Sequence, residues 1–452
     1  MCSGREGMTS SVRLNKILLA LADIAIYVMA FYLSFYLRYG WELPARNVEP
    51  FTFMLPWFIM VFMILLIVYD LYSIYIKFDE ILASLVCIVF LADIINVSLS
   101  FLFRQFAVPR SIFLISSILQ LLLLGIWRYV VWKKGLLIKN PRQALIIGYP
   151  GEIRKLLDSV NVSLDKGLLV TKEIRLNNKD NFSQSWSNFI SSAGSKAIEV
   201  ILICSSVGQK ERDAIVSYAL DEGKMIMLVP GIYEILLQQA KMVSAGDVPI
   251  MQLQGILAEG KPEVVKRITD IVFSLLGLVI LMPVALAIAL AIKLDSPGPV
   301  FYSQMRAGMR GQVFSLYKFR TMVLNAEKLS GPVMTDAGDR RITRVGHFLR
   351  RTRLDEIPQF INVLKGNMSL VGPRPERPFF LNEFREEIPE FEYRHQIRGG
   401  VTGLAQVEGN YTTDPSNKLR YDLYYAQKKS LMMDIVILLR TARVMLQRKK
   451  AS

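Results

Sequence analysis

The stretch that decides the fold is IVFSLLGLVILMPVALAIALAI, residues 271–292, where 22 consecutive residues carry no charge. A helix of this length reaches across the hydrocarbon core of a bilayer, which is about 30 Å thick. Pro283 lies near the middle, where proline removes a helix hydrogen bond and favours a kink. Basic residues stand on both sides of the stretch: Lys261, Lys266 and Arg267 before it, and Lys293, Arg306 and Arg310 after it.

Both ends of residues 271–292 are expected on the cytoplasmic side, because flanking lysines and arginines remain there. A re-entrant helix, which enters the membrane and returns with its break at Pro283, satisfies both observations. The alternative is a straight span, which would place everything after it on the opposite side.

Four further apolar runs occupy the first 132 residues, at 17–37, 51–69, 81–103 and 111–127. Buried helices of a soluble protein are the alternative, but four in succession favour membrane spans. The first run is too long for a cleaved signal peptide and lacks a small-residue cleavage site. Asp23 and Asp93 are the charged residues inside these runs, and they either pair across helices or mark a pathway.

The two ends of this four-span segment are both predicted to be cytoplasmic. Arg5, Arg13 and Lys16 precede the first run, and Arg128, Lys133 and Lys134 follow the fourth. An even number of spans returns the chain to the side on which it began, so this charge distribution is self-consistent.

Residues 141–260 have the pattern of a soluble α/β domain. Short apolar runs at 144–148, 200–204 and 225–229 predict buried strands, with helical stretches between them. Only Gly148 and Gly151 follow the first strand, whereas a dinucleotide fingerprint needs three glycines near a pyrophosphate. We therefore expect a Rossmann-like module without a bound nucleotide.

The charge balance of the 452-residue chain points to an anionic partner. It has 54 basic and 39 acidic residues, and residues 293–452 carry +11 of the net +15. Phospholipid headgroups, phosphorylated substrates and nucleic acid all suit such a field. Residues 340–353 hold six arginines around Ile342, Val345, Phe348 and Leu349, which predicts either an interfacial amphipathic helix or a solvated basic face.

The last third of the chain contains a series of distinctive motifs. They are DSPGPVFY (295–302), KFRTM (318–322), LDEIPQFINVLKGNMSLVGPRPE (354–376), GGVTGLAQVEGNY (399–411) and KLRYDLYYA (418–426). In this order, behind a proline-broken apolar run, they closely resemble the bacterial sugar transferases, which are polyprenyl-phosphate hexose-1-phosphate transferases. Four N-terminal spans and a Rossmann-like middle domain resemble the long form of that family.

The resemblance implies an enzyme that begins capsule, exopolysaccharide or O-antigen synthesis. It would transfer a sugar 1-phosphate from a UDP-sugar to undecaprenyl phosphate, and Mg²⁺ would be its cofactor. Asp355 would be the nucleophile, with Glu356 helping Asp355 to bind the metal. Phosphate contacts would come from Lys318, Arg350 and Arg374, and also from Arg320 unless that residue is a structural ion-pair partner. Glu376 could likewise either contribute to the site or form a structural ion pair.

The residues themselves are compatible with this chemistry. Pro358 suits the first turn of a helix over 359–364, so Asp355 and Glu356 would lie near a helix start that favours their ionised forms. An ionised aspartate can attack phosphorus, and oxygen ligands suit Mg²⁺. Arginine suits two-point binding of phosphate. Arg353 and Gly399 depart from the family pattern, which leaves the choice of sugar open.

The sequence thus predicts an integral membrane protein in three parts. Residues 1–140 form a four-helix transmembrane domain, 141–260 a Rossmann-like cytoplasmic domain, and 261–452 a mainly α, monotopic catalytic domain with the re-entrant helix. We expect a bacterial inner-membrane location, a cytoplasmic active site, contact with membrane lipids and no nucleic-acid partner. A homodimer is compatible with the sequence, as is a scaffold that has lost catalysis, although the intact Asp355–Glu356 pair argues against the latter. A third hypothesis, a membrane-tethered protein that binds nucleic acid, finds no support, because the sequence contains no recognisable nucleic-acid-binding motif.

Overall fold

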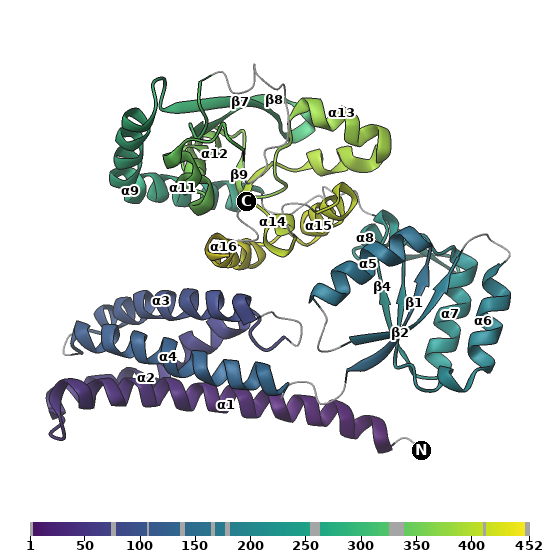
Figure 1. Ribbon diagram of the computed structural model, residues 1–452, viewed down its shortest axis with the longest axis horizontal. Coiled ribbons are helices and arrows are strands. Elements are labelled where there is room, and N and C mark those ends of the chain that lie inside the picture. Colours follow the sequence, from purple (N-terminus) through teal and green to yellow (C-terminus); the bar gives the residue numbers. More distant parts are fainter. Residues whose placement is uncertain are drawn as a thin grey trace. The chain divides into compact units, whose positions relative to one another are not determined.

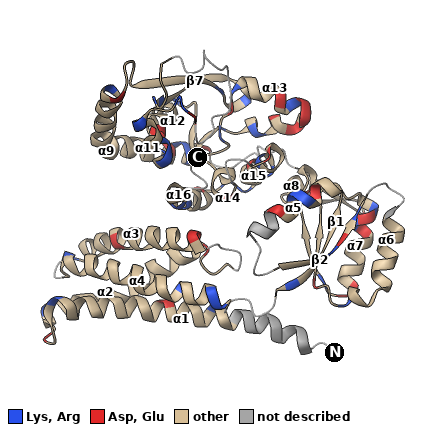
Figure 2. Cartoon of the chain, viewed as in Figure 1, with Lys and Arg blue, Asp and Glu red and all other residues tan. Residues whose placement is uncertain are grey.

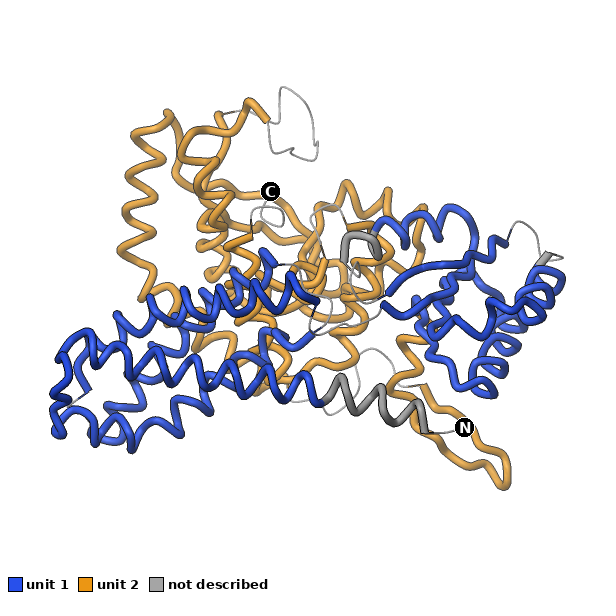
Figure 3. The backbone as a smooth tube through the Cα atoms, turned by 60° about the horizontal axis from the view of Figure 1, so that its bottom comes forward, with its two compact units in different colours: residues 1–230 blue, residues 231–452 orange. Residues whose placement is uncertain are grey.

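A computed structural model of the chain describes residues 3–73, 78–105, 108–135, 141–163, 168–176, 181–253, 263–324, 339–409 and 413–447. The chain divides into two compact units, Met1–Pro230 and Gly231–Ser452 (Figure 3). The domain boundaries predicted after residues 140 and 260 lie outside the described residues and stay predictions. So do Lys261 and the last two residues of the 399–411 motif, as well as the side chains of Arg5 and Arg13.

The first unit begins with four long helices, as the apolar runs predict. They are α1 (Ser3–Tyr39), α2 (Ala45–Val68), α3 (Phe78–Leu102) and α4 (Arg110–Lys134). Together with α9 (Glu263–Asp295), they are the five described helices whose length and composition suffice to cross a membrane. Figure 2 shows few charged residues along α1 to α4, and large apolar side chains such as Leu37, Phe90 and Leu114 are exposed on them. Apolar surface of this kind suits contact with lipid.

The two aspartates inside the apolar runs pair across helices, which is one of the two roles predicted for them. Asp23 of α1 forms an ion pair with Arg128 of α4, and Asp93 of α3 accepts a hydrogen bond from Ser117 of α4. Arg128 also donates to the Leu71 carbonyl at 2.8 Å. Because Arg128 is buried and paired with Asp23, it adds little to the exposed basic flank at this end of α4. Lys133 and Lys134 remain as the basic flank.

The rest of the first unit is a parallel four-stranded sheet with helices between its strands (Figure 1). Its strand order is β2-β1-β3-β4. The elements are β1 (Arg142–Gly148), α5 (Pro150–Ser163), β2 (Leu168–Arg175), α6 (Asn181–Ser191), η1 (Ala193–Ser195), β3 (Val200–Ile203), α7 (Gln209–Asp221) and β4 (Met225–Leu228). Three of these strands were predicted. The edge strand β2 was missed, because its apolar run stops after Val170 and the rest of the strand, TKEIR, is mostly polar and charged.

Close packing accounts for the glycine at the end of β1. A Cβ added to Gly148 would lie 2.6 Å from the Cys204 sulfur, so close packing at the end of β3 requires the glycine. Glu152, in the first turn of α5, accepts hydrogen bonds from the backbone nitrogens of Ser205 at 3.0 Å and Ser206 at 3.2 Å, and from both serine hydroxyls. A carboxylate of the chain itself therefore satisfies donors beside the carboxyl ends of β1 and β3.

The second unit is mainly helical with short strand pairs. Its elements are α8 (Ile232–Leu237), β5 (Lys241–Ala245), β6 (Val248–Gln252), α9, β7 (Phe301–Ala307), η2 (Met309–Gly311), β8 (Val313–Phe319), α11 (Arg344–Thr352), η3 (Leu354–Glu356), α12 (Gln359–Lys365), β9 (Ser369–Val371), α13 (Pro378–Glu387), η4 (Pro389–Gln396), β10 (Gly400–Thr402), α14 (Leu404–Glu408), α15 (Pro415–Lys428) and α16 (Leu431–Leu446). β5–β6 and β7–β8 pair antiparallel, and β9–β10 pair parallel. One core joins α8, β7–β8, β9 and α12 to α16, and a smaller one joins α9 to α11.

Both ends of helix α9 contact the rest of the second unit. Near its start, Arg267 Nη1 donates to the Val363 carbonyl at 2.6 Å, and the Asp270 carboxylate accepts from Leu370 N at 3.1 Å. Near its end, Ile292 is buried beside Leu349. Pro283 lies inside α9 and does not divide it into two helices. The predicted return of the chain at Pro283 therefore stays a prediction.

Candidate active site

Helix α11 directly precedes the acidic pair Asp355–Glu356 in the chain. The helix begins at Thr343, whose side chain accepts from Gly346 N at 3.0 Å, and Asp295 of α9 accepts from Val345 N at 3.1 Å. It ends at Arg353, which has a left-handed backbone with φ of 55°. A non-glycine residue rarely adopts this conformation, so the surrounding packing imposes it. The chain then turns into η3, which contains both carboxylates.

The amphipathic helix predicted over 340–353 is shorter than expected. Ile342 lies outside it and forms a bridge with Met322, and Leu349 is buried in the protein core. Phe348 is exposed. The apolar residues of this segment thus face the protein as well as the surface, and the prediction of one interfacial face was partly wrong.

The acidic pair lies where three of the sequence motifs meet. Lys318 of β8 places its Nζ atom 3.0 Å from Glu356 Oε1 and 3.8 Å from Asp355 Oδ2. Arg374, which follows β9, places Nη2 2.6 Å from the same Glu356 oxygen. The side chains of Asp355 and Glu356 are only 10% and 11% exposed. The KFRTM, LDE and GPRPE motifs therefore form one partly buried cluster of opposite charges.

The two adjacent carboxylates have different electrostatic environments. Burial would raise the pKa of Glu356, but the charges of Arg374 and Lys318 outweigh it and hold that pKa well below its usual value. Burial raises the pKa of Asp355, opposed by Lys318 and assisted by the charge of Glu356. The sequence predicts that the nearby helix start favours ionised Asp355, whereas burial is the largest effect on its pKa and acts in the opposite direction. The same cluster thus lowers the pKa of Glu356 and leaves that of Asp355 raised.

The loop that carries Arg374 is held by its main chain. Gly400 N donates to the Pro373 carbonyl at 2.8 Å, and Ala307 N donates to the Glu376 carbonyl at 3.0 Å. A Cβ at Gly399 would lie 2.6 Å from Pro375 Cγ, so the glycine at this position allows the two segments to approach. The departure of Gly399 from the family pattern is therefore accommodated by close packing.

Two further predicted phosphate ligands lie in different places: Arg350 beside the acidic pair and Arg320 at a neighbouring turn. Arg350 of α11 donates to Thr321 Oγ1 at 2.9 Å, and its charge lowers the pKa of Asp355. Arg320 is buried and donates to the Ser296 and Pro297 carbonyls at 2.7 and 2.8 Å. These hydrogen bonds join it to the DSPGP turn, which is a structural role, although its partners are carbonyls rather than the ion-pair partner left open for it. Phosphate binding by Arg320 thus loses support.

Three arginines near the cluster were missed by sequence reasoning. Burial lowers the pKa of Arg353, while the charge of Glu356 acts in the opposite direction, so its guanidinium belongs to the same electrostatic cluster. Arg306 and Arg394 lie behind the Arg374 loop, 3.7 and 3.8 Å from the Glu376 carboxylate. Glu376 is therefore an ion-pair partner of the loop. Only the position of Arg353 beside the motif could have indicated its role in advance.

The acidic pair fits a magnesium ion in donor chemistry. Mg²⁺ in phosphoryl-transfer sites uses one or two carboxylates together with substrate phosphates and water. No group of three metal-binding side chains occurs among the described residues, so this pair would need substrate oxygens to complete the coordination. Glu356 Oε1 already contacts two cations. Asp355 is therefore the ligand with fewer competing contacts.

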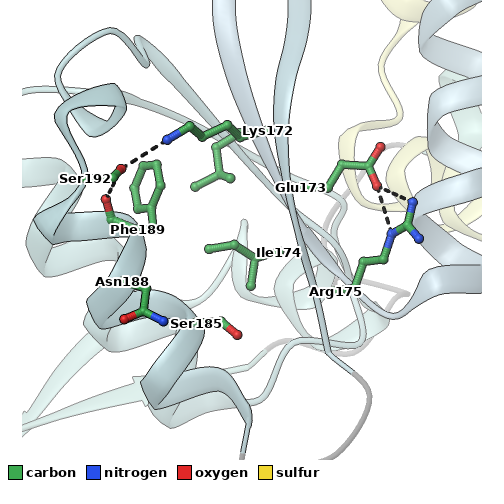
Figure 4. Close-up of a pocket in the computed structure, with 9 residues that line it drawn as sticks. Lys172, Glu173, Ile174, Arg175, Ser185, Asn188, Phe189 and Ser192 are labelled. Carbon is green, nitrogen blue, oxygen red and sulfur yellow. Dashed lines mark hydrogen bonds and ion pairs between the residues drawn. The ribbon is translucent and has the colours of Figure 1, made fainter.

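A shallow cavity of about 330 Å³ lies elsewhere, between β2 and α6 of the first unit (Figure 4). Its polar residues contact one another: Lys172 donates to Ser192 Oγ at 3.0 Å, and Arg175 pairs with Glu173. None of the sequence motifs contributes to its lining. These contacts leave no set of convergent groups that would define a ligand.

Comparison with known proteins identifies the class of protein that this cluster belongs to. A profile of the bacterial sugar transferases matches residues 261–448, and this chain belongs to that family. It is 43% identical over 198 residues to the UDP-N-acetylgalactosamine-undecaprenyl-phosphate N-acetylgalactosaminephosphotransferase of Aeromonas hydrophila, covering 43% of this chain and 47% of that protein.

Two further relatives carry similar descriptions. The UDP-glucose:undecaprenyl-phosphate glucose-1-phosphate transferase of Escherichia coli (strain K12) is 40% identical over 224 residues, 48% of this chain and 47% of that protein. The exopolysaccharide production protein PSS of Rhizobium leguminosarum bv. phaseoli is 44% identical over 195 residues, 41% of this chain but 98% of that protein. The matched stretch thus spans about half the length of the first two relatives and nearly all of the third.

Proposed function

We propose that this chain transfers a sugar 1-phosphate from a UDP-sugar to undecaprenyl phosphate, releasing UMP and forming undecaprenyl-diphosphate-sugar. The observation that carries the proposal is the arrangement of Lys318 and Arg374 on one carboxylate of the pair. Both cations contact Glu356, whereas Lys318 is the one ion-pair partner of Asp355 within 4 Å in the described part of the chain. The family relationship supplies the substrate class.

The proposed reaction has two steps, with Asp355 as the nucleophile. In the first, a carboxylate oxygen of Asp355 bonds to the sugar-linked phosphorus, and the bond to the bridging oxygen breaks, so that UMP leaves with the electron pair. In the second, a phosphate oxygen of undecaprenyl phosphate attacks the same phosphorus, and the acyl phosphate bond breaks to restore the carboxylate. A covalent intermediate of this kind divides one difficult transfer into two easier ones.

The basic side chains would neutralise the charge brought by the substrates. A diphosphate donor and a phosphate acceptor bring several negative charges together, and phosphoryl transfer depends mainly on positioning and charge stabilisation. Arg374 can bind a phosphate through two nitrogens while the buried Glu356 orients it. Lys318, between both carboxylates, and Arg350 would assist. Magnesium, bound by Asp355 and Glu356, would polarise the phosphate oxygens.

The membrane arrangement proposed for this chemistry is a cytoplasmic active site at the inner membrane, beside a re-entrant α9. Contacts from both ends of α9 support it, since Arg267 and Asp295 each bond to the same compact unit. A water-soluble donor would then meet a lipid acceptor at headgroup depth. The four N-terminal helices and the Rossmann-like domain would support assembly or regulation. The serine contacts of Glu152 favour a middle domain without a nucleotide.

The test is release of UMP by the full chain in lipid vesicles, with undecaprenyl phosphate as acceptor and a panel of UDP-sugars as donors. The proposal expects UMP and a lipid-linked sugar diphosphate with at least one donor. A chain that releases UMP with none of them, although folded and inserted, would favour a scaffold without catalysis.

A further inference from the structure

A buried ion pair lies behind the loop that carries Arg374. Arg394 of η4 places Nη2 2.8 Å from Asp422 Oδ2 of α15, and both side chains are only 2% exposed. The same Nη2 atom donates a hydrogen bond to the Arg374 carbonyl at 2.9 Å. One arginine thus joins the buried carboxylate to the main chain of Arg374.

The loop of residues 373–376 depends on side-chain donors such as Arg394 because two of its four residues are prolines. Four successive carbonyls, those of residues 373–376, each accept one hydrogen bond. Two of these bonds come from arginine side chains: buried Arg394 donates to the Arg374 carbonyl, and partly buried Arg306 donates to the Pro375 carbonyl at 3.0 Å. Pro373 and Pro375 have no backbone N–H, so they cannot contribute donors that would anchor the loop.

A buried ion pair is a costly way to stabilise a fold. Removing two charges from water carries a penalty that well-packed apolar residues avoid, so stability alone gives little reason for the pair. Burial raises the pKa of Asp422 to about 6, although Arg394 acts in the opposite direction, which reflects that penalty. The feature that apolar residues could not supply is a directed N–H at the Arg374 carbonyl.

We infer that Asp422 and Arg394 are positioning residues for Arg374. Asp422 holds the Arg394 guanidinium in place, and Arg394 fixes the main chain from which the Arg374 side chain reaches Glu356 Oε1 at 2.6 Å. The inference rests on the proposed function, in which Arg374 binds substrate phosphate. It gives a role to Asp422 of the KLRYDLYYA motif, which the proposed reaction does not otherwise use.

The experiment measures UMP release and thermal stability of full-length variants in vesicles. Asp422→Asn should lower kcat/KM on the order of 10- to 100-fold, the effect of a small displacement of a reacting group. The same change in an Arg374→Ala background should cause no further loss. Losses that multiply, or an Asp422→Asn enzyme within twofold of the unmodified one, would overturn the inference.

Two further variants separate positioning from folding. Leu419→Ala removes a buried side chain one turn earlier on α15, so it should lower the melting temperature and leave kcat/KM of the folded protein nearly unchanged. Arg394→Lys keeps a charge opposite Asp422, but its ammonium cannot reproduce the planar guanidinium contact with the Arg374 carbonyl. It should therefore lose activity while retaining more stability than Arg394→Ala. Equal losses of stability and activity across all these variants would contradict the inference.

Hydrogen exchange supplies a readout that does not depend on turnover. The amides of Gly400 and Ala307 donate to the loop carbonyls, so they should exchange faster in Asp422→Asn than in Leu419→Ala at comparable stability. Unchanged exchange at both amides would refute the positioning role even if the unmodified chain released no UMP. Failure of the proposed function, measured by UMP release, and failure of the positioning role, measured by hydrogen exchange, are thus distinguishable.

Discussion

Arg374 Nη2 lies 2.6 Å from Glu356 Oε1, in a pair whose carboxylate side chain is 11% exposed. The arginine and the carboxylate come from separate motifs, GPRPE and LDE. Their contact fixes Glu356 as an anion, and it presents a cation beside Asp355, the proposed nucleophile.

Replacing Arg374 with alanine should reduce kcat/KM strongly. The variant removes an oriented charge donor at the reacting centre, a loss of roughly 2–4 kcal/mol of transition-state stabilisation. It also leaves Glu356 with Lys318 as its remaining ion-pair partner among the described residues. Initial rates of UMP release measure the effect, and Arg385→Ala, which removes an exposed ion pair between α13 and η4, is the control. A near-normal kcat/KM would exclude Arg374 from the site.

Chelation of divalent cations should abolish turnover. The substrates and two carboxylates gather negative charge that Mg²⁺ would neutralise. UMP release is followed in excess EDTA and again after Mg²⁺ is restored in excess, with recovery as the control for irreversible damage. Full activity in EDTA would eliminate the metal from the proposal.

Asp355→Asn should remove the first chemical step altogether. The unmodified enzyme, mixed with donor and no lipid acceptor, should release up to one UMP per active site as the covalent intermediate forms. Asparagine preserves the shape but cannot act as the nucleophile, so neither burst nor turnover is expected. Rapid quenching measures the burst, and peptide mapping detects a sugar phosphate on Asp355. Direct attack by the lipid phosphate in a ternary complex instead predicts no burst and intersecting initial-rate lines.

Glu356→Gln should weaken activity by a different route. It removes the anion that holds Arg374 and Lys318, and it weakens the proposed metal site. Some activity is expected to return at high Mg²⁺. Titration of Mg²⁺ against the initial rate tests this expectation, and a rate that stays near zero at every concentration would assign Glu356 a role beyond metal binding.

Lys318→Met should shift the acidic limb of the pH profile upwards. Asp355 must be ionised to attack phosphorus, so activity falls as the pH drops through its pKa. Burial already raises that pKa, and the Lys318 charge lowers it, so losing Lys318 should raise it further. The pH dependence of kcat/KM reports the change, with Lys365→Met on α12 as a matched control. An unmoved acidic limb in an active Lys318→Met enzyme would refute this electrostatic role.

Cysteines placed at Val264 and Ser303 should react with membrane-impermeant reagents from the same, cytoplasmic side. Both positions flank the apolar part of α9, and Val264 is 70% exposed. Pro283→Leu restores a helix N–H and should favour a straight helix. Labelling in sealed spheroplasts and inverted vesicles measures the sidedness. Opposite labelling in the unmodified background would establish a straight span and contradict the re-entrant proposal.

The membrane helices, three of the four parallel strands and the acidic motif could be read from sequence because each depends on local composition. Uninterrupted apolar runs identify elements buried in lipid or in a sheet. Asp355 and Glu356 are adjacent in sequence, and Pro358 marks the start of the helix that follows them. The edge strand β2 was not identified, because its second half, TKEIR, is mostly polar and charged.

Contacts between distant segments were decided only by the tertiary structure. Arg128 resembles a flanking cytoplasmic charge in sequence, but it is buried against Asp23, more than 100 residues earlier. Lys318 and Arg320 belong to one motif, yet β8 ends at Phe319, so Arg320 leaves the strand and bonds the turn at Ser296. Asp422 and Arg394 likewise meet beneath the Arg374 loop from separate elements. Composition determines whether a segment is buried, whereas the partner that neutralises a buried charge depends on which segments the folded chain brings together.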